Sequence, residues 1–124
     1  MAVSSAPVLV TDRLELWLPT KHDIGPMHAI VADATTRQFL PPHAPPDHFM
    51  RFCRNAGSWM LFGYGAFMLR DRGGELIGNA GVFRTFRGLG EDFDDMPEAG
   101  WVLRADRVGQ GFALEAMTAA LGWF

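Results

Sequence analysis

The chain has 124 residues, which favours one domain, and it carries a net charge of −3 with 48% hydrophobic and 20% charged residues. This charge provides no field that would attract nucleic acid or an anionic membrane, and no apolar run is long enough to span a bilayer. The first residues lack the features of a signal peptide, and a single cysteine excludes an internal disulfide framework. We therefore expect a cytoplasmic protein that binds neither nucleic acid nor membrane.

The first part of the chain predicts a strand, a helix and a loop. Residues 14–18 alternate apolar and polar side chains, as a half-buried strand does. Asp23 is placed to cap a helix over residues 24–34. The apolar side chains on one face of this helix are Met27, Ile30 and Val31. Four prolines within residues 40–47 then predict a loop.

A second helix is expected after this loop, with Asp47 as its cap. Its pattern turns Phe49, Phe52 and Cys53 inward. Farther along, Trp59 and Phe62 lie near glycine-rich turns and are the aromatic residues that we expect to be exposed.

The second half of the chain predicts a hairpin, a strand and a helix. The hairpin arms are residues 66–69 and 76–83, and their turn carries Asp71 and a glycine pair. An acidic loop over residues 89–97 leads to a short buried strand, residues 99–103, and a helix over residues 111–124. The order β-α-α-β-β-β-α places consecutive strands in a meander, unlike the strict alternation of a doubly wound sheet.

The connection between the last strand and the last helix contains Gly109 and Gly111. Free N–H groups at a helix start, together with the helix dipole, favour an anion there. Glycines remove the Cβ atoms that would keep a phosphate away, and they permit successive N–H groups to point at one centre. Arg104 and Arg107 flank the loop and add positive charge. The combination favours a pyrophosphate site, with a plain glycine-rich connection as the alternative.

Two nucleotide motifs fit this loop poorly. A P-loop requires a lysine after its glycines, and none is present. A dinucleotide fingerprint requires a third glycine where Leu114 stands, and an acidic residue about twenty positions later, beyond Phe124.

Four short motifs lie in order along the chain. Thr-x-Arg-Leu-x-Leu comprises Thr11, Arg13, Leu14 and Leu16. Ile-Gly-x-x-Gly begins at Ile77, within the predicted hairpin. Glu-x-Gly-aromatic comprises Glu98, Gly100 and Trp101. Gly-x-Gly-x-Ala-x-Glu-Ala comprises Gly109, Gly111, Ala113, Glu115 and Ala116.

Together these motifs resemble the GNAT acetyltransferases, in particular the RimJ/RimL-like branch that acetylates protein N-termini, amino acids and small amines. The chain departs from the usual pattern at Trp17, where arginine is common, and at Asp106, where the wider family prefers glutamine or arginine. The resemblance implies an α/β (α+β) fold in which helices flank a mixed, mostly antiparallel twisted sheet. It also implies acetyl-CoA as co-substrate. The four histidines have no metal-ligand spacing with acids or Cys53, so no metal is expected.

By this resemblance, the pyrophosphate would lie on the N–H groups of residues 108–113, and the pantetheine arm would run against residues 101–103. The co-substrate site is therefore expected to comprise Trp101, Val102, Leu103, Arg104, Arg107, Val108, Gly109, Gln110, Gly111, Phe112 and Ala113.

Acetyl transfer requires a deprotonated amine, a polarised thioester carbonyl and a leaving thiolate, and in this family the amine attacks the thioester directly. Glu98, where the acidic loop becomes a strand, is the candidate general base, with a merely solvated carboxylate as the alternative. A backbone N–H within residues 101–103 would polarise the carbonyl. No residue takes the position of the family's tyrosine acid, and Tyr64 is expected to be structural. The acidic residues of the segment 91–98 would attract a cationic acceptor.

GNAT domains continue beyond the helix with which this sequence closes. We therefore expect residues 1–124 to form a single truncated acyl-CoA N-acyltransferase domain without the C-terminal strands, or one whose sheet a second copy completes as a homodimer. The expected function is acetyl transfer from acetyl-CoA to a primary amine on a protein N-terminus, an amino acid or a small molecule. The alternatives are a non-catalytic acyl-CoA-binding module or inactive fragment, and a nucleotide-binding fragment of an oxidoreductase.

Overall fold

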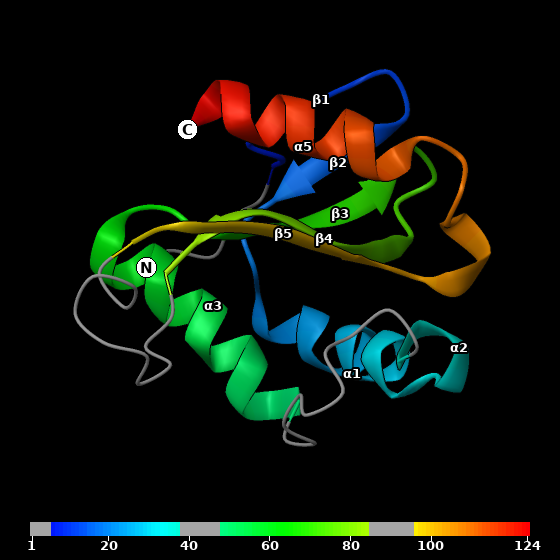
Figure 1. Cartoon of the computed structure of the whole chain (residues 1–124), viewed down its shortest axis with the longest axis horizontal. Coiled ribbons are helices and arrows are strands. Elements are labelled where there is room, and N and C mark those ends of the chain that lie inside the picture. The colour runs from blue at the N-terminus through cyan, green and yellow to red at the C-terminus, as the bar shows by residue number, and fades with distance from the viewer. Residues whose placement is uncertain (1–5, 38–47, 85–95) are drawn as a thin grey trace.

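A five-stranded antiparallel sheet forms the centre of the computed structural model, which describes residues 6–37, 48–84 and 96–124 (Figure 1). The strands follow one another across the sheet in sequence order. They are β1 (Leu9–Val10), β2 (Leu14–Trp17), β3 (Ala66–Asp71), β4 (Leu76–Phe83) and β5 (Glu98–Leu103). The helices are α1 (Ile24–Ala32), α2 (Ala34–Arg37), α3 (His48–Phe62) and α5 (Phe112–Trp123), with short 3₁₀ turns η1 (Lys21–Asp23) and η2 (Ala105–Arg107).

Helices cover both faces of the sheet. Helix α5 lies on one face, and α1 and α3 lie on the other (Figure 1). Strand β3 is apolar on both sides because it is covered twice: Phe67 and Leu69 belong to the core beneath α5, whereas Met68 belongs to the core beneath α1. The α5 core also includes Ala116, Met117 and Ala120 from the helix itself, where small side chains allow close packing against the sheet.

The structure confirms the predicted fold class and most of the predicted elements. The strand predicted at residues 14–18 forms as β2, and the hairpin and the last helix also form as expected. Met27, Ile30 and Val31 are buried on α1. Strand β1 and the short helix α2 were not predicted, since two and four residues are too few to show a period. The proline-rich segment 40–47 and its predicted helix cap Asp47 lie outside the described residues.

The predicted inward face of α3 is wrong. Cys53 is exposed, Phe49 is 56% exposed, and only Phe52 of the three is partly buried. The buried residues lie at the other end of the helix, where the Trp59 indole N–H donates a hydrogen bond to the Ala66 carbonyl at 3.0 Å. Trp59, which was expected to be exposed, is therefore buried because α3 contacts the start of β3, whereas Phe62 is exposed as predicted.

The last strand was predicted to be buried over residues 99–103, and this prediction is wrong. Ala99 is exposed and Trp101 is 58% exposed, and Leu103 is the buried residue of β5. Strand β5 lies at the edge of the sheet, and among the described residues it pairs only with β4. Residues 99–103 are apolar, but most of them are not buried because the strand is open on one side.

Asp23 begins α1 as predicted, but its carboxylate does not cap that helix. One oxygen accepts hydrogen bonds from the amide and the hydroxyl of Thr20 at 2.9 and 3.1 Å, and the other pairs with Arg70 at 2.7 Å. Asp23 thereby fastens η1 to β3 from a position that is only 1% exposed.

Candidate functional site: the glycine loop and the edge of β5

The glycine loop, residues 104–111, connects β5 to α5 and begins where Arg104 N–H still donates to the Ile77 carbonyl at 2.8 Å. Gly109 and Gly111 both have φ of 82°, in the left-handed region that side chains with a Cβ disfavour. Gly111 occupies the N-cap position of α5. The two glycines are therefore required by the backbone path that leads into the helix.

Several backbone N–H groups at this helix start have no hydrogen-bond acceptor among the described residues. Gly111 has no side chain that could cap α5, and the first intrahelical bond runs from Glu115 N–H to the Gly111 carbonyl at 3.1 Å. The amides of Phe112, Ala113 and Leu114 consequently lack an acceptor within the described part of the chain. These N–H groups and the positive end of the helix dipole make the loop suited to an anion.

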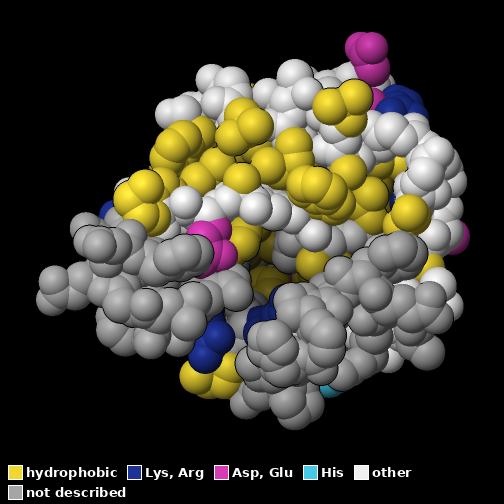
Figure 2. All heavy atoms as spheres, in the orientation of Figure 1, with side chains coloured by type: hydrophobic (Ala, Val, Ile, Leu, Met, Phe, Trp, Pro, Cys, Tyr) yellow, Lys and Arg dark blue, Asp and Glu magenta, His cyan; other side chains and the backbone are white. Residues whose placement is uncertain are grey.

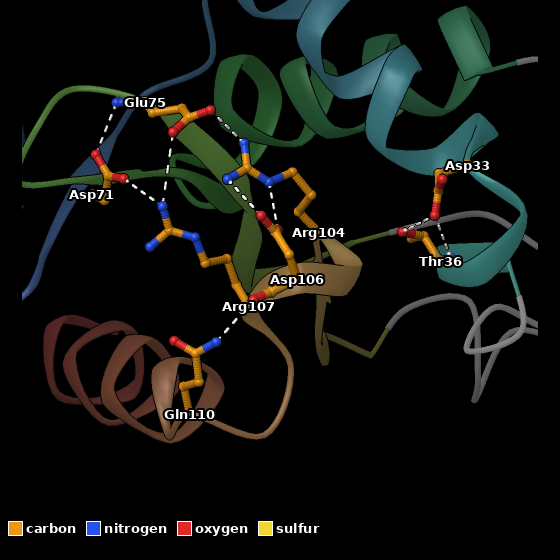
Figure 3. Close-up of polar contacts among 8 residues, drawn as sticks. All are labelled: Asp33, Thr36, Asp71, Glu75, Arg104, Asp106, Arg107 and Gln110. Atoms are coloured by element: carbon orange, nitrogen blue, oxygen red, sulfur yellow. Dashed lines mark hydrogen bonds and ion pairs between the residues drawn. The ribbon is translucent and has the colours of Figure 1, made fainter.

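The two loop arginines point toward carboxylates, and Figure 3 shows their ion pairs. Arg104 pairs with Glu75 and with Asp106, both at 2.6 Å. Arg107 pairs with Asp71 at 2.9 Å. Asp71 and Glu75 flank the tight turn between β3 and β4, so the arginines fasten the glycine loop to that turn. Their charges are compensated within the protein, which sequence spacing did not indicate.

These ion pairs have consequences for protonation. Hydrogen bonds to Asp106 and then to Glu75 raise the pKa of Arg104 above its ordinary value. The backbone N–H of Glu75 is the main cause that lowers the pKa of Asp71, and Arg107 adds to it. Arg104 and Asp71 therefore stay charged near neutral pH, which favours attachment of the loop to the turn.

Arg13 and Glu115 connect the first and the last motif of the sequence in space. Arg13 pairs with Glu115 at 2.7 Å, donates a hydrogen bond to the Gln110 carbonyl at 2.8 Å, and lies 4.2 Å from the centre of the Phe112 ring. Thr11 donates its hydroxyl proton to the same carboxylate. Sequence reasoning did not place Arg13 at this site, although it belongs to the same set of motifs as the loop.

The Glu115 contacts predict a pH-dependent contribution to stability. Burial acts to raise the pKa of Glu115, but hydrogen bonds from Thr11 and Arg13 outweigh it and hold the pKa below its ordinary value of 4.5. A carboxyl with a lowered folded-state pKa stabilises the fold above its unfolded pKa and loses this contribution as the pH falls through the folded pKa. We expect Glu115→Gln to lower the free energy of unfolding by about 1 kcal/mol at neutral pH.

The difference between wild type and Glu115→Gln should then shrink as the pH falls below the ordinary value of 4.5 and through the lowered pKa of the folded state. Thermal or urea unfolding at neutral pH and at about pH 3 measures this change. A difference of equal size at both pH values would contradict the role of the ionised carboxylate.

The edge of β5 that faces away from β4 carries backbone groups with no strand partner among the described residues. Arg104 and Ile77 form a hydrogen-bonded pair, and such pairs alternate with non-bonded pairs along an antiparallel ladder. The N–H groups of Ala99, Trp101 and Leu103 therefore point away from β4, toward the open edge. Of the side chains expected to contact pantetheine, Leu103 packs beneath α5, Val102 packs against the α1 core, and Trp101 is exposed.

Glu98 lies at the opposite end of β5 from the glycine loop. It pairs with Phe83 of β4 and is partly buried. Arg104 follows it by six positions along the chain, a distance of roughly 20 Å along β5. The structure thus places the candidate base and the candidate anion site at the two ends of one open edge. Most of the acidic segment 91–98 lies outside the described residues.

Hydrophobic side chains gather over α5 and over the strand edge beneath it, as Figure 2 shows. The exposed members from these two elements are Trp101, Leu114, Leu121 and Trp123, followed by Phe124 after the helix. Leu121 and Phe124 are more than half exposed. Tyr64 packs edge-on against Phe124, which agrees with a structural position for this tyrosine.

A separate pocket of about 530 Å³ lies on the other face of the sheet, between α1 and the β3–β4 turn. Its lining combines apolar side chains such as Ile30 and Leu76 with the charged residues Asp33, Arg70 and Arg104. Figure 3 shows Asp33 holding the amide and hydroxyl of Thr36. Sequence reasoning gave no signal for this pocket.

The described residues give two further observations. No group of three or more His, Cys, Asp or Glu side chains within them is arranged to hold a metal ion, and His43 is not among them. No helix in the described ranges is both long and apolar enough to cross a membrane.

Comparison with known proteins gives matches at the level of family and fold. Residues 13–124 match the acetyltransferase (GNAT) domain family. The structure is similar to that of a Bordetella pertussis protein assigned to the GNAT acetyltransferase family, with a TM-score of 0.75 and 32% identity over 93% of this chain and 70% of that one.

An acetyltransferase from Agrobacterium tumefaciens strain C58 is similar at a TM-score of 0.76 and 28% identity, over 99% of this chain and 69% of that one. No protein with a curated description matches the sequence. The family match nevertheless spans nearly the whole sequence and agrees with the structural neighbours. The chain therefore belongs to the GNAT acetyltransferase family.

Proposed function

We propose that this chain binds acetyl-CoA and transfers its acetyl group to a primary amine, as a member of the RimJ/RimL-like branch. The observation that carries the proposal is the start of α5, where left-handed Gly109 and Gly111 lead into a helix whose first amides have no acceptor in the described chain. Membership in an acetyltransferase family makes the pyrophosphate of acetyl-CoA the anion that suits this loop. The branch is supported by the motif residues Thr11 and Arg13, which contact the helix of the loop.

The proposed co-substrate site extends from the glycine loop along the edge of β5. The amides of residues 108–113 would hold the pyrophosphate, and the open edge at residues 101–103 would take the pantetheine arm. Backbone N–H groups that point outward from this edge can bind the amide oxygens of such an arm. Arg104 and Arg107 would act on the loop by fastening it to Asp71 and Glu75.

The proposed reaction is direct attack of the amine on the thioester. The amine nitrogen forms a bond to the carbonyl carbon, the carbon–sulfur bond breaks, and the thiolate leaves with the electron pair. Glu98 would accept the proton of the amine, directly or through a water molecule. The outward N–H of Trp101 would donate to the carbonyl oxygen as negative charge develops on it. The proposed acceptors are protein N-termini, amino acids and small amines.

A calorimetric titration with acetyl-CoA, with NADH as the control ligand, tests the proposal. We expect saturable binding of acetyl-CoA alone, and its loss in Gly109→Val and Gly111→Val, since valine is strained at a φ of 82° and its side chain would cover the amides. Gly57→Ala, within α3 and with nothing near its added Cβ, is the matched glycine control.

Three outcomes would count against the proposal in different ways. Absence of binding by a chain that circular dichroism shows to be folded would contradict it. Equal binding of NADH would favour a nucleotide-binding fragment. Binding of acetyl-CoA without release of coenzyme A in the presence of any amine from a panel of peptides, amino acids and polyamines would favour a non-catalytic acyl-CoA-binding module.

A further inference from the structure

Arg13 reaches the glycine loop from the turn between β1 and β2. One guanidinium nitrogen donates a hydrogen bond to the Gln110 carbonyl at 2.8 Å, and another pairs with Glu115 at 2.7 Å. The guanidinium carbon lies 4.2 Å from the centre of the Phe112 ring. A single side chain therefore contacts the residue before Gly111 and two residues after it.

The hydrogen bond to Gln110 also sets the direction of an N–H group. In a trans peptide, the carbonyl of Gln110 and the N–H of Gly111 lie in one plane and point in opposite directions. A contact that holds the carbonyl on one side therefore holds the N–H on the other. Glycine permits many backbone conformations, so a peptide next to Gly111 needs such a contact to keep one orientation. If this peptide turned over, a carbonyl oxygen would face the anion.

The ion pair with Glu115 has a second effect on the same site. Glu115 lies in the first turn of α5, where its negative charge would oppose an anion bound at the helix start. Arg13 compensates this charge, while its backbone amide and the Thr11 hydroxyl occupy the second carboxylate oxygen. Arg13 thus removes a repulsion and fixes a donor at the same loop.

We propose that Arg13 is a positioning residue for the pyrophosphate of the co-substrate. It acts through the Gln110–Gly111 peptide and through Glu115, and its role requires no contact with the phosphates. This inference rests on the proposed binding of acetyl-CoA by the glycine loop.

The experiment compares Arg13→Ala, Arg13→Lys and Arg72→Ala. Arg72 is the matched control because it donates a hydrogen bond to the Thr11 carbonyl at 3.1 Å, in the same turn, without a contact to the glycine loop. Binding is measured with coenzyme A by calorimetry and with pantetheine, which has no pyrophosphate, by NMR titration. We expect Arg13→Ala to weaken coenzyme A binding about tenfold or more and to leave pantetheine binding unchanged.

Lysine should restore part of the affinity for coenzyme A, since it keeps the charge beside Glu115 but lacks the planar fork that reaches two acceptors. If Arg13→Ala is not folded by circular dichroism, the comparison of Arg13→Lys with Arg72→Ala carries the test. Coenzyme A affinity equal in the Arg13 variants and Arg72→Ala would overturn the inference and leave the proposed function intact. Equal losses for both ligands would overturn it in favour of a general structural role. Failure of the wild type to bind coenzyme A would overturn both proposals.

Discussion

Replacing Gly78 by alanine is expected to lower the free energy of unfolding by on the order of 4 kcal/mol or more. Gly78 pairs with Leu103 across the β4–β5 ladder. A Cβ at this position would lie 2.0 Å from the Val102 carbonyl oxygen and 3.0 Å from the Leu103 Cα. These are backbone atoms, so the clash cannot be relieved by a side-chain rotation. It requires β5 to move away from β4.

Gly57→Ala is the control for this substitution. It makes the same chemical change within α3, where an added Cβ meets nothing within 4 Å. Alanine is favoured over glycine inside a helix, so this variant should gain about 0.5–1 kcal/mol. Urea unfolding of both variants gives the two values. A Gly78→Ala protein as stable as wild type would show that the β4–β5 pairing is not as close as the structure has it.

This clash explains a motif that sequence analysis could describe only as a resemblance. The Ile-Gly-x-x-Gly pattern of β4 contains Gly78 and Gly81, and both glycines face backbone of a neighbouring strand. At Gly81 a Cβ would lie 2.7 Å from the Gly65 carbonyl oxygen. Spacing along the chain shows where the glycines are. The reason for them lies in strand partners that only the register reveals.

Element types could be predicted more reliably than the direction in which side chains face. The β3–β4 hairpin has a glycine turn between two apolar runs, and this local signal sufficed. Exposure depends on neighbours that are distant in sequence. Phe49 is exposed because α3 contacts the sheet at its other end, and Trp101 is exposed because β5 lies at the sheet edge. An apolar strand such as β5 would be buried if it lay at the centre of the sheet.

Half of the candidate site followed from local pattern, and the rest followed from contacts between distant segments. Gly109 and Gly111 have the conformation that their spacing before a helix suggested. Glu75 and Asp71, which pair with Arg104 and Arg107, flank the β3–β4 turn, about thirty residues earlier in the chain. Arg13 is farther still from its partner, since it precedes Gln110 by 97 positions in the sequence. No spacing rule connects residues so far apart in the sequence. The carboxylate partners of the loop arginines were therefore not predicted, and both arginines were interpreted as positive charge available to a phosphate.

Substitution of Glu98 is expected to affect catalysis without affecting co-substrate binding. If Glu98 is the general base, Glu98→Gln should lower kcat by a factor of about 10² to 10⁴, since glutamine cannot accept the proton of the amine. The Kd for acetyl-CoA should stay within about twofold of wild type, because Glu98 lies at the end of β5 opposite the glycine loop. Glu15→Gln, on β2, is the matched control.

The pH dependence of kcat separates a base from a residue that only supports the strand. A general base gives wild type an acidic limb, along which activity falls as the base becomes protonated, and Glu98→Gln should lose this limb. A purely structural role would lower kcat at every pH and leave the limb in place. Retention of more than about a tenth of wild-type kcat, with the acidic limb unchanged, would assign proton removal to another group or to solvent. The open edge of β5 would then serve to position the thioester, and the amine would have to arrive already deprotonated.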